Sequence, residues 1–438
     1  MGNYSSDLII IGAGAAGLMA AAGAGETFVR NGHHGKIVVL EKMPRPGRKI
    51  MITGKGRCNY TNIKEWNEFS QHIHPKPNFL KPSFYNLSSD RMIDYMAEHG
   101  MESVAERGDR VFPVSHLASS VVDALVGAAQ EAGAQIECGK EVGEITRHEG
   151  GFRVVCTDGT VYQAPKVIIC TGGLSYPKTG STGDGYRWAE EMGHSLKPLF
   201  PSLTAIVPFG YKDTIVSKGH IDRSTPLTET GRMLCGNQLK NVNLSLIVDG
   251  NEAQSEFGDL DFTDGGIEGP IGFKVSRKCV NAIINGSKVY VVIDMKPAVD
   301  EEDLSVRIST LWNEVCKDKR NAQKLYKDRF RLLLAKVLPM SLIPAFVRCC
   351  PNADHKSLAH TLKTWKFEIS GYVGYERCVI TAGGVSLEEV TPKTLESKLV
   401  PGLYFAGEVL DLDADTGGYN LQTAFSTGYL AGISAAKS

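Results

Sequence analysis

A strand-turn-helix pattern at the start of the chain most constrains its fold. The run DLIII (7–11), which is apolar after its first residue, is followed at once by GAGAAG and then by the helix-forming run LMAAA. Gly12, Gly14 and Gly17 have the G-x-G-x-x-G spacing: the first permits a tight turn, the second lets the backbone approach a pyrophosphate, and the third allows close helix-strand packing. The pattern predicts a Rossmann-like α/β domain with a dinucleotide at the helix N-terminus, which Ala16 would also contact.

A second apolar strand, residues 37–40, ends in Glu41, and Lys42 follows it. A carboxylate at this position accepts hydrogen bonds from both hydroxyls of an adenosine ribose and repels a 2′-phosphate. The acid therefore favours FAD or NAD over NADP.

Composition indicates an ordinary soluble enzyme. The 438 residues are 42% hydrophobic, the net charge is −1, and the ten cysteines contain no C-x-x-C pair. We expect reduced thiols and a cytoplasmic location. The uncharged run 8–25 is too interrupted by glycine and too closely flanked by acids to predict a membrane span. His72 and His74 form H-x-H without further ligand motifs, so no metal site is expected.

Five segments are expected along the chain. The α/β pattern opens and closes the protein, and its middle is predicted to be an insertion that covers the cofactor and shapes the substrate pocket. The segments are the first part of the dinucleotide domain (1–195), an inserted β-rich, barrel-like domain (196–298), a small helical subdomain (299–364), returning strands of the β domain (365–378) and the second part of the dinucleotide domain (379–438).

Two further segments suit a cofactor site. A buried strand at residues 166–170 runs into Thr171, Gly172 and Gly173, where the glycine pair lets backbone approach a cofactor. Near the other end of the chain, GLYFAGE (402–408) is followed by TGGYNLQ (416–422). We predict that both chain ends close around one flavin.

Several long motifs resemble those of the bacterial FAD-binding flavoproteins of the aminoacetone oxidase family, including BaiN-like proteins of bile-acid metabolism. The resemblance covers nearly the whole chain in order. The motifs are GRKIMITGKGRCNYTN (47–62), TGGLSYPKTGSTGDGY (171–186), FTDGGIEGP (262–270), TAGGVSLEEVTPKTLESKLVPGLYFAGE (381–408) and DADTGGYNLQTAFSTGYLAG (413–432).

The resemblance implies the family's fold and FAD as cofactor. Val142 would lie at the adenine, Arg48 and residues 53–59 along the pyrophosphate and flavin ring, and Gly407 and Glu408 at the ribityl and phosphate region. The helix N-terminus after TGG would face the pyrimidine edge of the flavin, where its dipole stabilises negative charge. The cofactor-binding residues implied within these segments are Thr53, Gly54, Arg57, Cys58, Asn59, Gly418, Asn420, Leu421 and Gln422.

TGDG (182–185) is also similar to fumarate reductase and succinate dehydrogenase flavoproteins, which carry a His and an Arg before the C-terminal glycine pair. Here DLDADT has neither residue, so we do not expect a dicarboxylate substrate. Asp411, Asp413 and Asp415 would repel one or attract an amine.

Three residues are catalytic candidates, each with a structural alternative. Arg57 would stabilise negative charge or simply pair with an acid. Cys58 would be a redox or proton-donating group or a small packing residue. Tyr419 would position or protonate a substrate or pack beside the ring.

Three functions remain open. The first is an FAD-dependent oxidoreductase of a small organic molecule, by activated C=C reduction or amine oxidation. The second is uridine reduction in ribosomal RNA, supported by a basic helix expected at 317–336. The third is a flavin-binding protein without turnover. Because the chain has one G-x-G-x-x-G, any NAD(P)H would meet the flavin transiently.

Overall fold

The computed structural model describes residues 2–213 and 219–437, which form two compact units. The first comprises residues 1–200 and 379–438, and the second residues 201–378. The first unit continues to residue 200, beyond the boundary of 195 expected from sequence. The helical residues 299–364, expected as a separate subdomain, belong to the second unit.

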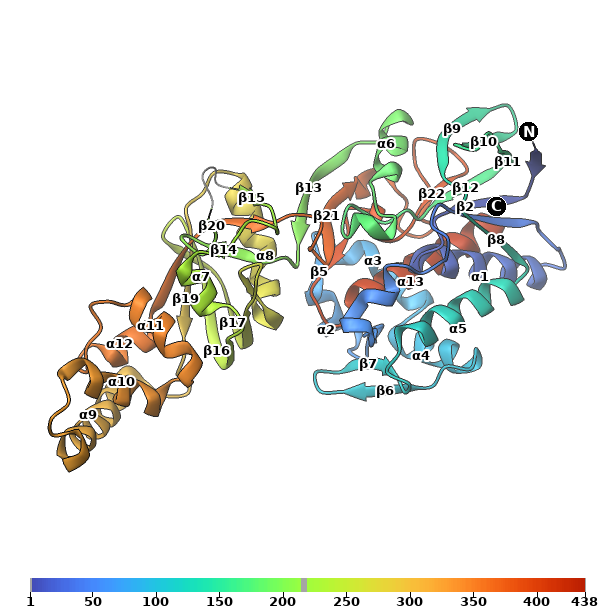
Figure 1. Cartoon of the computed structure of the whole chain (residues 1–438). Coiled ribbons are helices and arrows are strands. Elements are labelled where there is room, and N and C mark those ends of the chain that lie inside the picture. Colours follow the sequence, from blue (N-terminus) through green and yellow to red (C-terminus); the bar gives the residue numbers. More distant parts are fainter. Residues whose placement is uncertain (1, 214–218, 438) are drawn as a thin grey trace. The chain divides into compact units, whose positions relative to one another are not determined.

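A five-stranded parallel sheet forms the centre of the first unit (Figure 1). Its three central strands are almost continuous runs of Ile, Val and Leu because both faces are covered. The predicted Rossmann-type fold is confirmed. In order across the sheet, the strands are β22 (Leu403–Phe405), β12 (Lys166–Ile169), β2 (Leu8–Ile11), β3 (Ile37–Glu41) and β8 (Ala134–Cys138).

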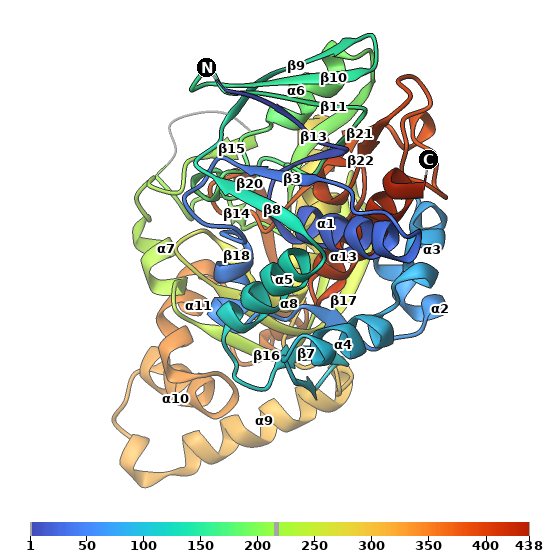
Figure 2. The same ribbon diagram turned by 90° about the vertical axis from the view of Figure 1, so that its right-hand side faces the viewer.

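Helices cover one face of this sheet, and a second sheet of four strands covers the other (Figure 2). The helices are α1 (Ala15–Arg30), α5 (Ala118–Glu131) and α13 (Tyr419–Lys437). The covering sheet consists of β1 (Asn3–Ser5), β11 (Val161–Ala164), β10 (Gly151–Cys156) and β9 (Val142–His148).

Smaller elements complete the first unit. The chain leaves it through β13 and returns through β21, which pair with each other. The remaining strands are β4 (Thr61–Asn62), β5 (Ile73–His74), β6 (Ser103–Glu106), β7 (Arg110–Pro113), β13 (Leu196–Ser202), β21 (Ile380–Val385) and β23 (Asp413–Ala414), and the helices are α2 (Trp66–Phe69), α3 (Pro77–Asn86), α4 (Ser89–Glu98) and α6 (Asp184–Glu191).

The second unit contains a closed β-structure, because its first strand pairs with strands on both sides. An additional strand, β15 (Gly219–Ile221), pairs in parallel with β20. Around the closed ring the strands are β14 (Ile206–Pro208), β18 (Ile267–Glu268), β17 (Asn251–Phe262), β16 (Gln238–Val248), β19 (Val289–Asp294) and β20 (Trp365–Val373). The helices of this unit are α7 (Glu229–Leu234), α8 (Gly269–Ile284), α9 (Glu301–Lys317), α10 (Tyr326–Val337), α11 (Ile343–Cys349) and α12 (Leu358–Lys363).

The prediction of a single basic helix at 317–336 is wrong. Helix α9 ends at Lys317, a short 3₁₀ turn covers Lys319–Asn321, and α10 begins at Tyr326. Asp318 ends the first helix by accepting a hydrogen bond from the backbone N–H of Arg320 at 2.9 Å, which favours a turn over helix continuation. Among the described residues, no helix is long and apolar enough to cross a membrane.

Small residues allow α1 and α13 to pack closely. A Cβ atom on Gly428 would lie 2.1 Å from the carbonyl oxygen of Ala16, and one on Gly432 would lie 2.0 Å from that of Ala20. Both contacts advance by four residues, so the two helices run in the same direction. Nine residues of α13 precede Gly428, whereas one residue of α1 precedes Ala16. The N-terminus of α13 therefore extends about 12 Å beyond that of α1.

Gly428→Ala should destabilise the protein by about 1–3 kcal/mol, because its methyl group overlaps the Ala16 carbonyl and forces the helices apart. The measurement is the urea unfolding midpoint. Gly127→Ala is the matched control: Gly127 lies in α5, and a Cβ atom on it would have no neighbouring atom within 4 Å, so this change should stabilise the protein by up to about 1 kcal/mol. Equal midpoints for the two variants would contradict the tight helix contact.

Candidate functional site

Three parallel strands bring distant segments to one edge of the sheet. Ile11 of β2 pairs with Ile169 of β12, which pairs with Phe405 of β22. Parallel strands in this register end at the same edge, so the turns after residues 11, 169 and 405 lie side by side. The first and last parts of the chain thus meet where an open α/β sheet binds its ligand.

The three glycines of the first turn differ in what surrounds them. Gly12 has a φ of +100°, and a Cβ on it would lie 2.6 Å from the carbonyl oxygen of Cys170. A Cβ on Gly17 would lie 1.8 Å from the carbonyl oxygen of Gly12. Gly14 has a φ of −86°, which any residue adopts, and no atom within 4 Å of its missing Cβ. Neither backbone nor packing demands glycine at Gly14, so the open space above it fits the phosphates of a bound dinucleotide.

Glu41, predicted from the sequence to bind the adenosine ribose, ends β3 at this edge. Its carboxylate oxygens accept hydrogen bonds from the backbone N–H groups of Ala13 and Met43, both at 2.8 Å. Burial raises the pKa of Glu41, and these hydrogen bonds oppose the shift. Each oxygen keeps a lone pair for a ribose hydroxyl. Lys42 is bound to Asp184 at 2.7 Å, and Val142 is buried at the start of β9.

Glu408, just after β22, is held entirely by protein groups. It accepts hydrogen bonds from Lys49 at 2.6 Å, Ser175 at 2.7 Å and the backbone N–H of Thr381 at 2.9 Å. A Cβ on Gly173 would lie 2.9 Å from this carboxylate. The glycine pair after Thr171 was expected to admit a cofactor, but the group that it approaches is this cluster of side chains; Gly172 lies against the same cluster.

Gly407 and Ala16 meet at the junction of the two chain ends. A Cβ on Gly407, whose φ is +77°, would lie 2.8 Å from that of Ala16. Ala16 is buried in this contact rather than facing the open space above Gly14.

The loop containing Thr53, Gly54 and Cys58 is unusual because several of its residues have left-handed backbone conformations. Among them are Lys55 and Cys58, which are not glycine. Cys58 is fully buried, which raises the pKa of its thiol to about 12. It is therefore not a thiolate at neutral pH.

Two cationic side chains of this region differ in their partners. Arg57 pairs with Glu106, lies 2.9 Å from His116 and covers the ring of Phe112 at 4.4 Å. Arg48 is exposed and has no ion pair or hydrogen bond within the described chain, which leaves its charge available to a phosphate.

Helix α13 begins directly after Gly417 and Gly418, whose φ angles are +132° and +98°. A Cβ on Gly418 would lie 2.9 Å from the side-chain oxygen of Asn59, a buried acceptor with no hydrogen-bond partner in the structure. The helix N-terminus could donate hydrogen bonds to a ligand, and the Asn59 oxygen beside it could accept one. A ligand that carries both acceptor and donor groups would fit this arrangement.

The polar side chains in the first turn of α13 are occupied by protein. Asn420 bonds the backbone of residues 414 and 415, and Gln422 bonds Thr61 and the carbonyl oxygen of Leu87. Leu421 is partly buried against the core. These residues therefore offer a ligand their backbone N–H groups and the helix dipole rather than their side chains.

Tyr419 is packed between aromatic rings. Its ring centroid lies 4.9 Å from that of Phe69 and 4.3 Å from that of His72. Burial, together with the nearby Asp415 charge, raises the pKa of Tyr419, so the phenol remains neutral. Of the two roles predicted for Tyr419, these contacts fit packing against neighbouring rings.

A cluster that sequence reasoning missed lies beside Tyr419. Asp415 accepts hydrogen bonds from His72 at 2.9 Å and His74 at 3.2 Å. Asp415 directly follows β23, which pairs with β5, so H-x-H and D-x-D face each other across two antiparallel strands. In the sequence, the period of two in both motifs, which places His72 with His74 and Asp413 with Asp415 on one face of a strand, could have indicated this pairing. No group in residues 2–213 and 219–437 has the arrangement of a metal site.

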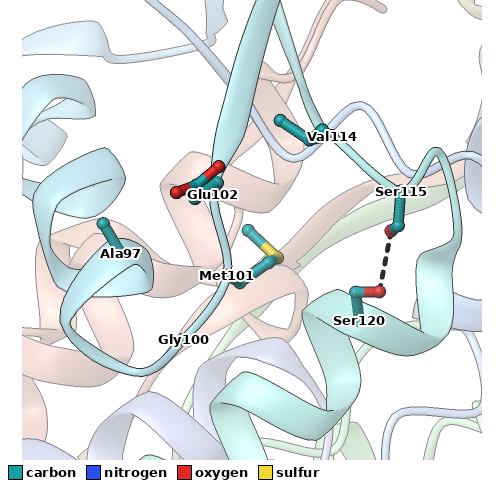
Figure 3. A pocket seen from close by; sticks show the side chains of 7 residues that line it. All are labelled: Ala97, Gly100, Met101, Glu102, Val114, Ser115 and Ser120. Carbon is teal, nitrogen blue, oxygen red and sulfur yellow. Dashed lines mark hydrogen bonds between the residues drawn. The ribbon is translucent and has the colours of Figure 1, made fainter.

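A pocket of about 410 Å³ also lies in the first unit (Figure 3). It is lined by Ala97 of α4, Ser120 of α5 and residues of the loops before β6 and after β7, and the side chains of Ser115 and Ser120 are hydrogen-bonded at 2.8 Å. None of the predicted site residues lines it. The predicted cofactor-binding residues gather at the sheet edge and not in this pocket, so the sheet edge is the candidate site.

A family model, described as the HI0933-like protein Rossmann domain, matches residues 6–434. The chain belongs to the HI0933-like family. This HI0933-like protein is an FAD-dependent oxidoreductase, as expected from the motifs. The open space above Gly14, the Glu41 carboxylate and the free Arg48 guanidinium fit the two halves of FAD. When bound, FAD supplies hydride chemistry at its ring nitrogen N5.

Relatives match over almost the full chain. The ribosomal RNA dihydrouridine synthase of Escherichia coli K12 is 29% identical over 97% of this chain and 96% of its own. The 3-dehydro-bile acid delta(4,6)-reductase of Clostridium scindens is 28% identical over 98% of both chains. A solved flavocytochrome c3 fumarate reductase covers 99% of this chain and 78% of its own, at 16% identity and a TM-score of 0.48.

Gly14→Val should leave the fold intact but lower FAD affinity at least tenfold, about 1.4 kcal/mol, because the side chain fills the phosphate space without touching protein. Flavin absorbance per purified protein and circular dichroism measure the two effects. Gly17→Val is the contrast: it clashes with Gly12 and should lose folded structure as well as flavin. A yellow, fully loaded Gly14→Val protein would show that the dinucleotide lies elsewhere.

Proposed function

We propose that this protein is an FAD-dependent reductase that saturates a C=C bond conjugated to a carbonyl. The observation that carries the proposal is the pair of full-length relatives. One is named for making dihydrouridine, which differs from uridine by two hydrogens across such a bond, and the other for reducing a 3-dehydro-bile acid. Their molecules differ greatly in size and polarity, so the feature common to both is the reaction type.

The acidic residues before α13 also favour reduction over amine oxidation. Asp415 is paired with two histidines, and Asp411 and Asp413 are buried with partners of their own. None of the three is a free carboxylate that would attract a substrate ammonium group. The first turn of α13 instead supplies N–H groups and a positive dipole end, which suit a carbonyl oxygen or the negative charge of a reduced flavin.

We further propose NAD(P)H as the electron source and the cytoplasm as the location. The described chain contains one parallel sheet of the dinucleotide-binding type, so a nicotinamide would reach the flavin through the substrate site and leave before the acceptor enters. All ten cysteines are free, in keeping with a reducing compartment.

Anaerobic reduction by NADH or NADPH should bleach the flavin, and a conjugated carbonyl compound should restore its colour. Suitable acceptors are 2-cyclohexen-1-one, 4-androstene-3,17-dione and uridine 5′-monophosphate. Stopped-flow absorbance follows both half-reactions, and cyclohexanone, which lacks the C=C bond, is the control. Bleaching by aminoacetone, with no reoxidation by any of the three acceptors, would contradict the proposal and favour an amine oxidase.

Uridine in ribosomal RNA is the second candidate substrate, because it contains the same conjugated bond. The surface from α9 to α10 carries exposed cations, of which Lys319, Lys327 and Arg331 have no acidic partner within the described chain. Beside them, Trp312 stacks on His355 at 4.5 Å, and Tyr326 is exposed. Cations next to exposed aromatic rings are typical of surfaces that bind single-stranded nucleic acid.

Replacing Lys319, Lys327 and Arg331 by Glu should weaken binding of a uridine-rich RNA oligonucleotide. The slope of log affinity against log salt should fall in magnitude by about 2, because three phosphate contacts are lost. Fluorescence anisotropy over a KCl series measures the slope. A matched triple variant, with Arg147, Lys240 and Lys393 changed to Glu, has the same charge change on other exposed positions and should retain it. Equal slopes, or no binding by wild type at low salt, would exclude this surface.

A further inference from the structure

The strongest unassigned feature is the group formed by His72, Asp415 and His74 beside the start of α13. Nδ1 of His72 lies 2.9 Å from Oδ2 of Asp415, and Nε2 of His74 lies 3.2 Å from Oδ1. One carboxylate therefore holds two imidazoles, each through a different oxygen. We refer to these three residues as the His-Asp-His cluster.

The backbone fixes the position of this cluster. The N–H group of Asp415 bonds the carbonyl oxygen of His72 at 2.9 Å, and Asn420 of α13 donates to the carbonyl oxygen of Asp415. The ring of His72 stacks on Tyr419, the first residue of α13, with an angle of 22° between the planes. The cluster is thus joined to the helix N-terminus that the flavin site uses.

Asp415 is a fixed negative charge. Burial alone would raise its pKa, but the hydrogen bonds with the two histidines outweigh burial and lower the pKa to about 2. The other titratable groups near the cluster are Asp413, which pairs with His74 across the two strands, Tyr419 on α13 and Glu68 on α2, and Lys64 pairs with Glu68. The carboxylate that is hydrogen-bonded to both imidazoles is Asp415.

Each imidazole has one ring nitrogen without a hydrogen-bond partner among the described residues. His72 and His74 each use one ring nitrogen on Asp415, and their side chains are 23% and 30% exposed. His194 shows what a purely structural histidine looks like in this chain: it is buried and uses both nitrogens, on the carbonyl oxygen of Ala189 and on Ser397. The histidines of the cluster have a free nitrogen with access to a ligand, and His194 does not.

We propose that His72 and His74 are the proton donors of the substrate site, and that Asp415 positions them. This inference rests on the proposed function. Reduction of a conjugated C=C bond forms one C–H bond from hydride at the β-carbon and one from a proton at the α-carbon. The electrons originate from reduced nicotinamide and pass through FAD. The proton comes from an imidazolium N–H bond that breaks, and solvent restores it at the exposed ring.

The kinetic test separates the two half-reactions in the FAD-loaded protein. His72→Gln combined with His74→Gln should bind FAD and bleach with NAD(P)H as wild type does, while reoxidation by the best acceptor slows about 100-fold. Asp415→Asn should lower the reoxidation rate at saturating acceptor and leave the acceptor concentration at half-maximal rate unchanged, because the imidazoles lose the carboxylate that holds them in place. His99→Gln is the matched control: His99 contacts Glu131 at 3.1 Å and Tyr95 in the same unit, outside the site.

A second measurement does not depend on turnover. Diethyl pyrocarbonate should modify His72 and His74 in the FAD-loaded protein, and 2-cyclohexen-1-one, 4-androstene-3,17-dione or uridine 5′-monophosphate should protect them. Mass spectrometry of the digested protein locates the modified residues, with His99 as the unprotected reference. Protection by one of these compounds without a change at His99 supports the inference.

The outcomes distinguish this inference from the proposed function. If wild type and the double variant are reoxidised at the same rate, the proposed function stands and the histidines are not the donors. If no acceptor reoxidises even wild type, the proposed function fails, and labelling alone decides whether the cluster lies in the ligand site. Histidines that none of the compounds protects would overturn the inference.

Discussion

The in-register pairing of β2, β12 and β22 is the constraint on which the rest of the site depends. These strands come from the beginning, the middle and the end of the chain, and their parallel pairing places their carboxyl ends at one edge. The glycine turn before α1 can then meet Gly407, and α13 can pack along α1. Without this edge, neither helix N-terminus would point at a common ligand.

Small residues set how the two helices lie at this edge. Because Gly428 and Gly432 let α13 lie directly against α1, the two helices run together with their N-termini offset by about 12 Å. In the proposed arrangement, the N-terminus of α1 would contact the phosphates and that of α13 would lie farther along an extended cofactor. The conformation of Gly14 and its protein surroundings would accept other residues. A bound ligand in the open space above it would explain why glycine occurs at this position.

Each carboxylate around the site is balanced locally. Backbone N–H groups hold Glu41, Lys49 holds Glu408, and two histidines hold Asp415. Buried or half-buried carboxylates need such partners because their desolvation is costly. The positive ends of α1 and α13, together with Arg48, which has no ion pair among the described residues, therefore remain the uncompensated positive charges of the candidate site, which suits phosphates and the charge of a reduced flavin.

The sequence by itself determined the Rossmann-type fold, the glycine turn and Glu41, because each depends on short-range spacing that a strand-turn-helix unit carries in consecutive residues. The FAD-dependent chemistry followed from the resemblance of the long motifs to a flavoprotein family. Only the tertiary structure decided where side chains point. In the structure, the side chains of Gln422 and Asn420 form hydrogen bonds with protein groups, and Gly173 lies next to the Glu408 carboxylate. The segment expected as one helix at 317–336 contains a 3₁₀ turn. The tertiary structure also joined His72 and His74 to Asp415, more than 340 residues away, since a contact across two antiparallel strands depends on a register that no local pattern encodes.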